Sequence, residues 1–180
     1  MTRYVAFLRG VNVGGKSLLK MEDLKATLIA EGWKHVSTYI QSGNVFFSHA
    51  GTDQQAIARK LTAVIKQHFH MEVEAVVFSA ADWQKVMAAA PNWWGDREGW
   101  KHNLLILIPP TTPEEAITAI GELKPDIEAV QAGPRVVFQS MFFQKFGQTT
   151  TGKLASNAVY KKMTVRNANT SRKIAHLLEV

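Results

Sequence analysis

Two short stretches decide the fold: Gln41-Ser42-Gly43-Asn44 and Gln131-Ala132-Gly133-Pro134. Each lies between two short apolar runs, a pattern typical of a hairpin turn, and we expect Gly43 and Gly133 to supply the unusual backbone angles. The second stretch follows the first by half of the 180-residue chain. A period of that length indicates an ancient duplication rather than a solenoid.

The apolar patterns around the two turns predict the same order of elements in each half. In the first half, strands are expected at 4–8, 37–40, 45–48 and 73–78. Three helices are expected: one at 21–31, one that begins at the capping-box pattern Thr52-x-x-Gln55, and one at 82–90. In the second half, strands are expected at 103–108, 127–130, 136–139 and 163–166, with helices from Thr112-Pro113-x-Glu115, at 154–162 and at 170–178.

This order predicts an α+β protein of two tandem ferredoxin-like (βαββαβ) halves with mostly antiparallel sheets. We place the first half at residues 1–91, a connecting segment at 92–101, and the second half with its C-terminal helix at 102–180. The segment Trp93-Trp94-Gly-Asp-Arg-Glu-Gly-Trp100 resembles an aromatic platform for bases, or alternatively covers an edge of the core.

The composition restricts the class of protein. With 46% hydrophobic and 20% charged residues, the chain can bury a core. It has no cysteine, which excludes disulfides, thiolate metal sites and cysteine nucleophiles. No apolar run reaches the length of a membrane span, and the first residues enter a strand pattern without a signal peptide. We therefore expect a cytoplasmic protein with no membrane partner.

Positive charge is concentrated near the C-terminus. The net charge is +6, and from Arg135 onward eight lysines and arginines face one acid, Glu179. This asymmetry favours a polyanionic partner, with a solvated basic face as the alternative.

The stretch Gly10-x-x-x-x-Gly15-Lys16-Ser17 matches the phosphate loop of nucleotide hydrolases. Its context does not fit, because the helix begins several residues later and the next two strands form a hairpin that a parallel sheet forbids. No strand ends in the aspartate that would hold magnesium. A nucleotide hydrolase is therefore not expected.

Two loops, 9–20 and 140–153, are longer than their counterparts in the other half, and both are rich in Gly and Lys. Glycines let backbone amides turn toward an anion, and lysine adds charge. We expect Arg9, Asn12, Lys16 and Lys153 to contact such an anion. The alternative is that the glycines only permit tight turns, with Asn12 in the left-handed region.

A third polar cluster, 164–172, leaves a strand and begins a helix. Asn169 or Thr170 can cap that helix, and Arg166 and Arg172 near its N-terminus would attract a phosphate or carboxylate. The alternative is a well-capped helix with solvated arginines. The alternating residues His68, His70, Glu72 and Glu74 need not share a face, so no metal site is expected there.

Three segments together resemble the signatures of the bacterial domain-of-unknown-function family 1697: 8–16 (LRGVNVGGK), 39–45 (YIQSGNV) and 164–170 (TVRNANT). The resemblance covers nearly the whole chain and implies an α+β fold of two ferredoxin-like halves, without implying a particular reaction. The chain departs from the family pattern at Ala168, where an aromatic residue is usual, and at Gly152-Lys153-Leu154, where Ser-Lys-Leu is common.

The leading hypothesis is a cytoplasmic protein that binds a phosphate-bearing ligand, either nucleic acid or a nucleotide-like metabolite, without a cofactor or metal. The expected binding residues are Arg9, Asn12, Lys16, Gln41, Asn44, Lys153, Arg166, Asn167, Asn169 and Thr170. The first alternative is a small enzyme acting on a phosphorylated or carboxylated metabolite between the halves, although no general base falls inside the three motifs. The second is a structural or partner-binding protein.

Overall fold

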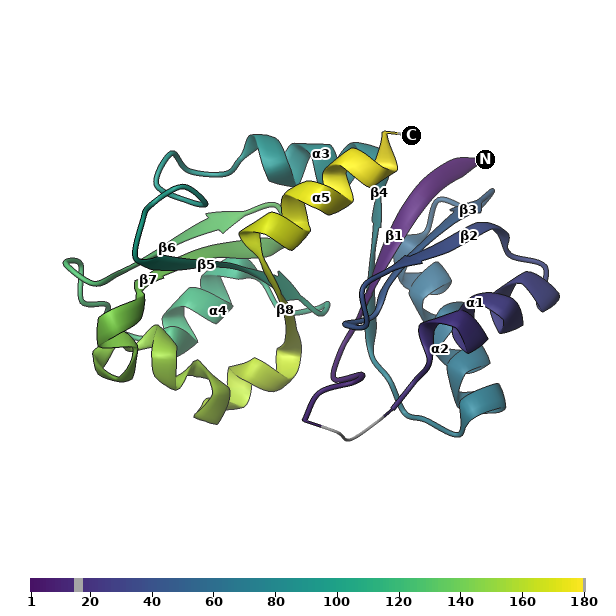
Figure 1. The fold of residues 1–180 in the computed structure, drawn as a ribbon, viewed down its shortest axis with the longest axis horizontal. Coiled ribbons are helices and arrows are strands. Elements are labelled where there is room, and N and C mark those ends of the chain that lie inside the picture. The colour runs from purple at the N-terminus through teal and green to yellow at the C-terminus, as the bar shows by residue number, and fades with distance from the viewer. Residues whose placement is uncertain (15–17, 180) are drawn as a thin grey trace. The chain divides into compact units, whose positions relative to one another are not determined.

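The computed structural model describes residues 1–14 and 18–179. The chain forms two compact units, each with its own sheet (Figure 1). The first contains Met1–Trp83 and the C-terminal residues from Ile174, and the second contains Gln84–Lys173. Among the described residues, no helix combines the length and the apolar character that crossing a bilayer requires.

The sheet of the first unit has the strand order β2-β3-β1-β4, with every neighbouring pair antiparallel. Its elements, in chain order, are β1 (Thr2–Leu8), α1 (Met21–Ala30), β2 (Lys34–Tyr39), β3 (Asn44–His49), α2 (Gln54–Phe69), β4 (Ala75–Ser79) and α3 (Ala80–Ala88). The two predicted strands around the first turn are thus a hairpin, each slightly longer than expected.

Strand β1 lies in the middle of this sheet because its run of apolar residues can be buried on both faces. Tyr4, Ala6 and Leu8 face α1 and α2 in one continuous core. On the opposite face, the ring of Phe7 lies 4.7 Å from that of Trp83, centroid to centroid. Burial on both faces explains why this segment is a near-continuous hydrophobic run rather than an alternating one.

The sheet of the second unit has the order β6-β7-β5-β8, again antiparallel throughout. Its elements are β5 (Trp100–Leu107), α4 (Pro113–Ile120), β6 (Glu128–Gly133), β7 (Val136–Phe142), three 3₁₀ turns η1 (Phe143–Gln148), η2 (Thr151–Ser156) and η3 (Ala158–Lys162), β8 (Met163–Asn167) and α5 (Ala168–Leu178). The α-helix predicted at 154–162 is therefore wrong, since this segment forms η2 and η3.

The sequence predicts the N-terminal cap of α4 correctly and that of α2 incorrectly. Helix α4 begins at Thr112 with the expected capping box, in which the Thr112 hydroxyl accepts from the Glu115 amide and the Glu115 carboxylate accepts from the Thr112 amide. At α2 the predicted cap, Thr52, is wrong. Asp53 caps that helix by accepting from the amides of Gln55 and Ala56. An aspartate one residue later outcompetes the hydroxyl because its carboxylate reaches two amides.

The two hairpins use different turn chemistry. Gly43 has φ +78°, as expected, and its carbonyl accepts from the amide of Leu8 at 2.8 Å. The expectation for Gly133 is wrong, because this glycine ends β6 in the sheet, paired with Val136. Arg135 takes the left-handed angle instead, with φ +62°. Pro134 fixes its own φ, so the strain falls on the residue that follows it.

Candidate functional site

The first glycine-rich loop is tied to the scaffold through Asn12. This residue has φ +56°, and its side-chain nitrogen donates to the carbonyls of Leu19 and Gln41 at 2.8 and 2.7 Å. Its side-chain oxygen accepts from the Leu19 amide at 2.8 Å. These contacts favour the turn-forming alternative for Asn12. Lys16, which is expected from the sequence to contact an anion, lies outside the described residues.

The second glycine-rich loop already holds an anion, and that anion belongs to the chain. The carboxylate of Glu128, on β6, accepts from the backbone amides of Lys124, Thr150 and Thr151 at 2.8–2.9 Å and from the Thr151 hydroxyl at 2.7 Å. Glu128 is only 1% exposed. The amides of this loop do turn toward a negative charge, as its sequence predicts, but they enclose a side chain rather than a ligand.

The charge state of Glu128 follows from these contacts. Burial alone would raise the pKa of the carboxyl group, because it penalises the ionised form. The hydrogen bonds from Thr151, Thr150 and Lys124 together outweigh burial and hold the pKa below its ordinary value. Glu128 is therefore ionised at neutral pH and fixes the start of η2 to the sheet.

The other predicted residues of the two loops and the first hairpin lie in several places. Asn44 is fully buried and donates to the Tyr39 carbonyl at 2.9 Å, so it stabilises the hairpin. Gln41 and Lys153 are exposed on different units. The backbone amide of Arg9 donates to the carbonyl of Glu74. Arg9, Gln41 and Asn44 therefore lie in the first unit and Lys153 lies in the second.

The third cluster surrounds the junction of β8 and α5. Asn167 caps α5, its side-chain oxygen accepting from the Thr170 amide at 2.7 Å, which corrects the cap predicted at Asn169 or Thr170. Arg166 is buried and donates to the Thr164 hydroxyl and the Val165 carbonyl. Burial lowers the pKa of Arg166 to about 10, so it remains charged at neutral pH. Asn169 is exposed.

A polar cleft of about 700 Å³ in the second unit brings Asn167 and Asn169 together with the connecting segment. Strand β8 ends at Asn167, opposite Asn103, while β5 continues back to Trp100. The overhanging end of β5 therefore forms one wall. The lining residues are Gly95, Asp96, Arg97, Glu98, Trp100, Lys101, His102, Asn103, Asn167, Ala168 and Asn169. The volume suits a small molecule or one nucleotide.

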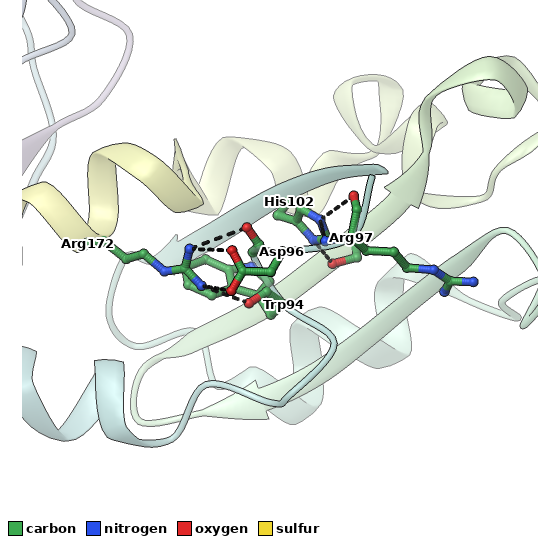
Figure 2. Close-up of polar contacts among 7 residues, drawn as sticks. Trp94, Asp96, Arg97, His102 and Arg172 are labelled. Carbon is green, nitrogen blue, oxygen red and sulfur yellow. Dashed lines mark hydrogen bonds and ion pairs between the residues drawn. The ribbon is translucent and has the colours of Figure 1, made fainter. Parts of the chain in front are cut away.

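Arg172, on α5, holds the connecting segment in place. Its guanidinium donates to both carboxylate oxygens of Asp96, at 3.2 and 3.3 Å, and to the carbonyls of Trp94 and Gly95, each at 3.3 Å (Figure 2). The side chain of Arg97 points away from this cluster (Figure 2). Arg172 is thus a structural clamp rather than a solvated arginine.

The tryptophans of the connecting segment have separate roles. Trp94 is buried, donates from its indole nitrogen to the Asn103 carbonyl at 2.8 Å, and packs edge-on against Phe138. It covers the sheet, as the second of the two sequence interpretations expected. Trp100 is half-buried in the wall of the cleft, and the guanidinium carbon of Arg97 lies 3.8 Å from the centre of its ring. Trp100 is the part of the segment that still fits the interpretation as an aromatic platform for bases.

His102 provides a titratable group inside the cleft. Its Nδ1 lies 2.6 Å from the Ser140 hydroxyl, and its Nε2 lies 3.4 Å from the backbone nitrogen and oxygen of Arg97. Burial lowers the pKa of His102, the charges of Arg172 and Arg97 act in the same direction, and Asp96 and the Arg97 backbone oppose them. The imidazole is therefore neutral at pH 7.

Sequence reasoning missed the wall formed by Lys101, His102 and Asn103. None of these residues belongs to the three motifs, and only the charged and aromatic composition of 92–101 signalled a surface of interest. The pairing of β5 with β8 brings this wall to Asn167, and the sequence does not disclose that register. In the described part of the chain, no three acidic, histidine or cysteine residues are grouped for a metal.

These features define an α+β protein with two antiparallel four-stranded sheets and a polar cleft in its second unit. Residues 1–138 match the model of the family described as "Protein of unknown function (DUF1697)", and the chain belongs to that family. It is 28% identical to a conserved bacterial protein from Streptococcus pneumoniae, with a TM-score of 0.87 and 98% of each chain covered. The search of curated proteins gave no match.

Proposed function

We propose that this protein binds a phosphate-bearing ligand with an aromatic base, a nucleotide or a nucleic acid, in the cleft of the second unit. The observation that carries the proposal is the pairing of Trp100 with Arg97 on the wall of a cleft that Asn167 and Asn169 also line. Because Arg97 lies over the face of Trp100, its planar guanidinium offers the base a stacking surface and the phosphate a positive charge.

The polar groups of the cleft complement such a ligand. Arg97 and Lys101 supply positive charge, Glu98 adds a negative charge, and Asp96 is engaged by Arg172. Asn103 keeps its orientation by donating to the side-chain oxygen of Gln139 at 3.0 Å. Amide side chains both donate and accept hydrogen bonds, so they can recognise the edge of a base.

The proposal relocates the anion site from the glycine-rich loop at 147–153 to the cleft. In that loop the amides of Thr150 and Thr151 are occupied by Glu128, and displacing a buried carboxylate would leave it without partners. The cleft needs no such displacement.

The test is titration with deoxyadenosine monophosphate at low salt, followed by calorimetry. We expect binding that weakens as salt rises, and that falls in Arg97→Ala and in Lys101→Ala. Lys25→Ala, which removes an exposed lysine from α1, is the matched control and should bind like the parent. Failure of the parent to bind, or equal loss in the control, would contradict the proposal.

A small enzyme is the second candidate function, and His102 is the observation that favours it. A neutral imidazole in a polar cleft can act as a general base, a group that the three motifs lack. Incubation with a pool of nucleotides and sugar phosphates, analysed by mass spectrometry, should then give a product that His102→Gln does not form. No product from the parent would contradict an enzymatic role toward these compounds.

We also propose that the two halves of the sequence, 1–91 and 102–180 with the connecting segment 92–101, descend from one ferredoxin-like βαββαβ ancestor. The corresponding strand orders and the Gln-x-Gly sequence at both hairpins support this duplication. A cytoplasmic location is likewise a proposal, and the lack of cysteine supports it.

A further inference from the structure

Two exposed phenylalanines in η1 set this turn apart from the rest of the second unit. Phe143 is 54% exposed and Phe146 is 42% exposed, whereas Trp94 and Phe138 of the same unit are buried. Folding normally covers such rings, and a cluster of them on a surface marks an interaction site more often than isolated apolar residues do.

Lys101 joins these rings to the cleft. Its ammonium nitrogen lies 4.1 Å from the ring centre of Phe143 and 5.6 Å from that of Phe146. The same lysine lines the cleft. A ligand that contacts Lys101 from the cleft therefore has two aromatic faces next to it, and a cation that already lies beside both.

Positive charge is concentrated in this part of the sequence. From residue 129 to residue 178 the sequence contains eight lysines and arginines and no acid, although Arg166 is buried and Arg172 is paired with Asp96. Lys145 lies in η1 itself, and Lys124 donates to the carbonyl of Gln148 at the end of that turn. An apolar or cationic protein surface would not be attracted by this positive charge. A polyanion with aromatic groups would interact with both the lysines and the rings.

We infer that Phe143, Phe146 and Lys101 form a base-stacking surface beside the cleft, and that the ligand is a single-stranded nucleic acid rather than a mononucleotide. One base stacks on the Arg97 guanidinium beside Trp100 in the cleft, Lys101 contacts the backbone, and following bases stack on the two phenylalanines. This inference rests on the proposed function, because it extends the ligand out of the same cleft.

The test compares a fluorescein-labelled deoxyadenosine octamer with deoxyadenosine monophosphate. We expect the octamer to bind at least tenfold more tightly than the mononucleotide, because stacking adds free energy for each further base. Changing both Phe143→Ala and Phe146→Ala should lower octamer affinity about tenfold or more and leave mononucleotide affinity unchanged. Lys101→Ala should weaken both.

The matched control removes two exposed apolar side chains from the first unit. Ile29 and Ile40 are 51% and 47% exposed, so the pair Ile29→Ala and Ile40→Ala should leave octamer affinity unchanged. Circular dichroism spectra identical to the parent's establish that both double variants are folded.

The outcomes separate this inference from the proposed function. Mononucleotide binding without tighter binding of the octamer overturns the inference and leaves the proposed function standing. Octamer binding that is insensitive to the two phenylalanines also overturns it. If the double phenylalanine variant instead abolishes a dimer in sedimentation, the rings bury a second copy and the inference is wrong. If neither probe binds, both proposals fail.

Discussion

The connection between the third and fourth strands differs between the two units, although their strand orders correspond. In the first unit this connection contains α2, a regular helix whose buried stripe is Ile57, Leu61, Val64 and Ile65. In the second unit it contains η1, η2 and η3, with only Thr151, Leu154 and Val159 buried among their residues. The first connection is held by apolar packing, and the second combines the apolar contacts of Leu154 and Val159 with the buried charge of Glu128.

The difference shows that corresponding connections can leave different surfaces. The apolar stripe of α2 is buried, whereas η1 leaves Phe143 and Phe146 on the surface. The second unit carries the cleft and these exposed rings, and exposed apolar side chains of the first unit, such as Ile29 and Ile40, lie outside α2.

Removing an apolar anchor of α2 should have the largest effect. Leu61 is fully buried, so Leu61→Ala should lower the free energy of unfolding by about 3–4 kcal/mol through lost transfer free energy and the cavity left behind. The loss should be the same at pH 5 and pH 7, since no charge is involved. Urea denaturation at both pH values measures it, and a loss that varies with pH would contradict apolar anchoring.

Removing the charge of Glu128 should cost about 2–3 kcal/mol at pH 7. In Glu128→Gln the side-chain NH₂ group must face backbone amides that are themselves donors. Because the folded pKa of Glu128 is lowered, its stabilisation is present above the ordinary carboxyl pKa and is lost as pH falls through the folded pKa. The variant and parent should therefore converge in stability in acid, as followed by urea denaturation.

The exposed Glu114→Gln is the control for Glu128→Gln and should change stability by less than about 0.5 kcal/mol. If Glu128→Gln costs no more than this control at pH 7, the second connection is not held by the carboxylate, and the contrast between the two units is lost.

Gly43→Val should destabilise the protein by about 1–3 kcal/mol. A side chain at φ +78° is strained, and a Cβ atom there would lie 2.6 Å from Cγ2 of Val11 and 2.7 Å from Cβ of Leu8. Thermal melting measures the loss. Gly51→Ala is the control, because Gly51 has no such angle and a Cβ there approaches only the His49 ring. A Gly43→Val protein as stable as the parent would show that the turn does not constrain the first hairpin.

Local sequence patterns sufficed for the strands, the hairpins and most of the helices. The capping box at Thr112 acts through neighbours within a few residues, and the apolar run of β1 and the glycine at position 43 can be recognised locally although their contacts are distant. The turns η1 to η3 escaped prediction because contacts of this connection reach distant residues, such as the bond from the Thr150 amide to Glu128, 22 residues away. An interaction of that range leaves no periodic signal in the segment it holds.

The candidate site was predicted less well than the fold, for a related reason. Asn167 and Asn169 come from a recognised motif, but their partners on β5 become neighbours only through the register of β5 with β8. The sequence of the loop 147–153 indicates backbone amides that face an anion, and in the structure they do. It does not indicate that this anion is the side chain of Glu128.

The most direct test of the central claim is an NMR titration of the isotope-labelled protein with deoxyadenosine monophosphate. The loop at 147–153 is an anion-binding candidate from the sequence and the cleft is one from the structure, and amide shifts report on each separately. We predict that the indole signal of Trp100 and the signals of Lys101, Asn167 and Asn169 shift with ligand concentration, while those of Thr150 and Thr151 stay in place. Shifts confined to Thr150, Thr151 and Lys153, or no shift in the cleft at saturating ligand, would contradict the account.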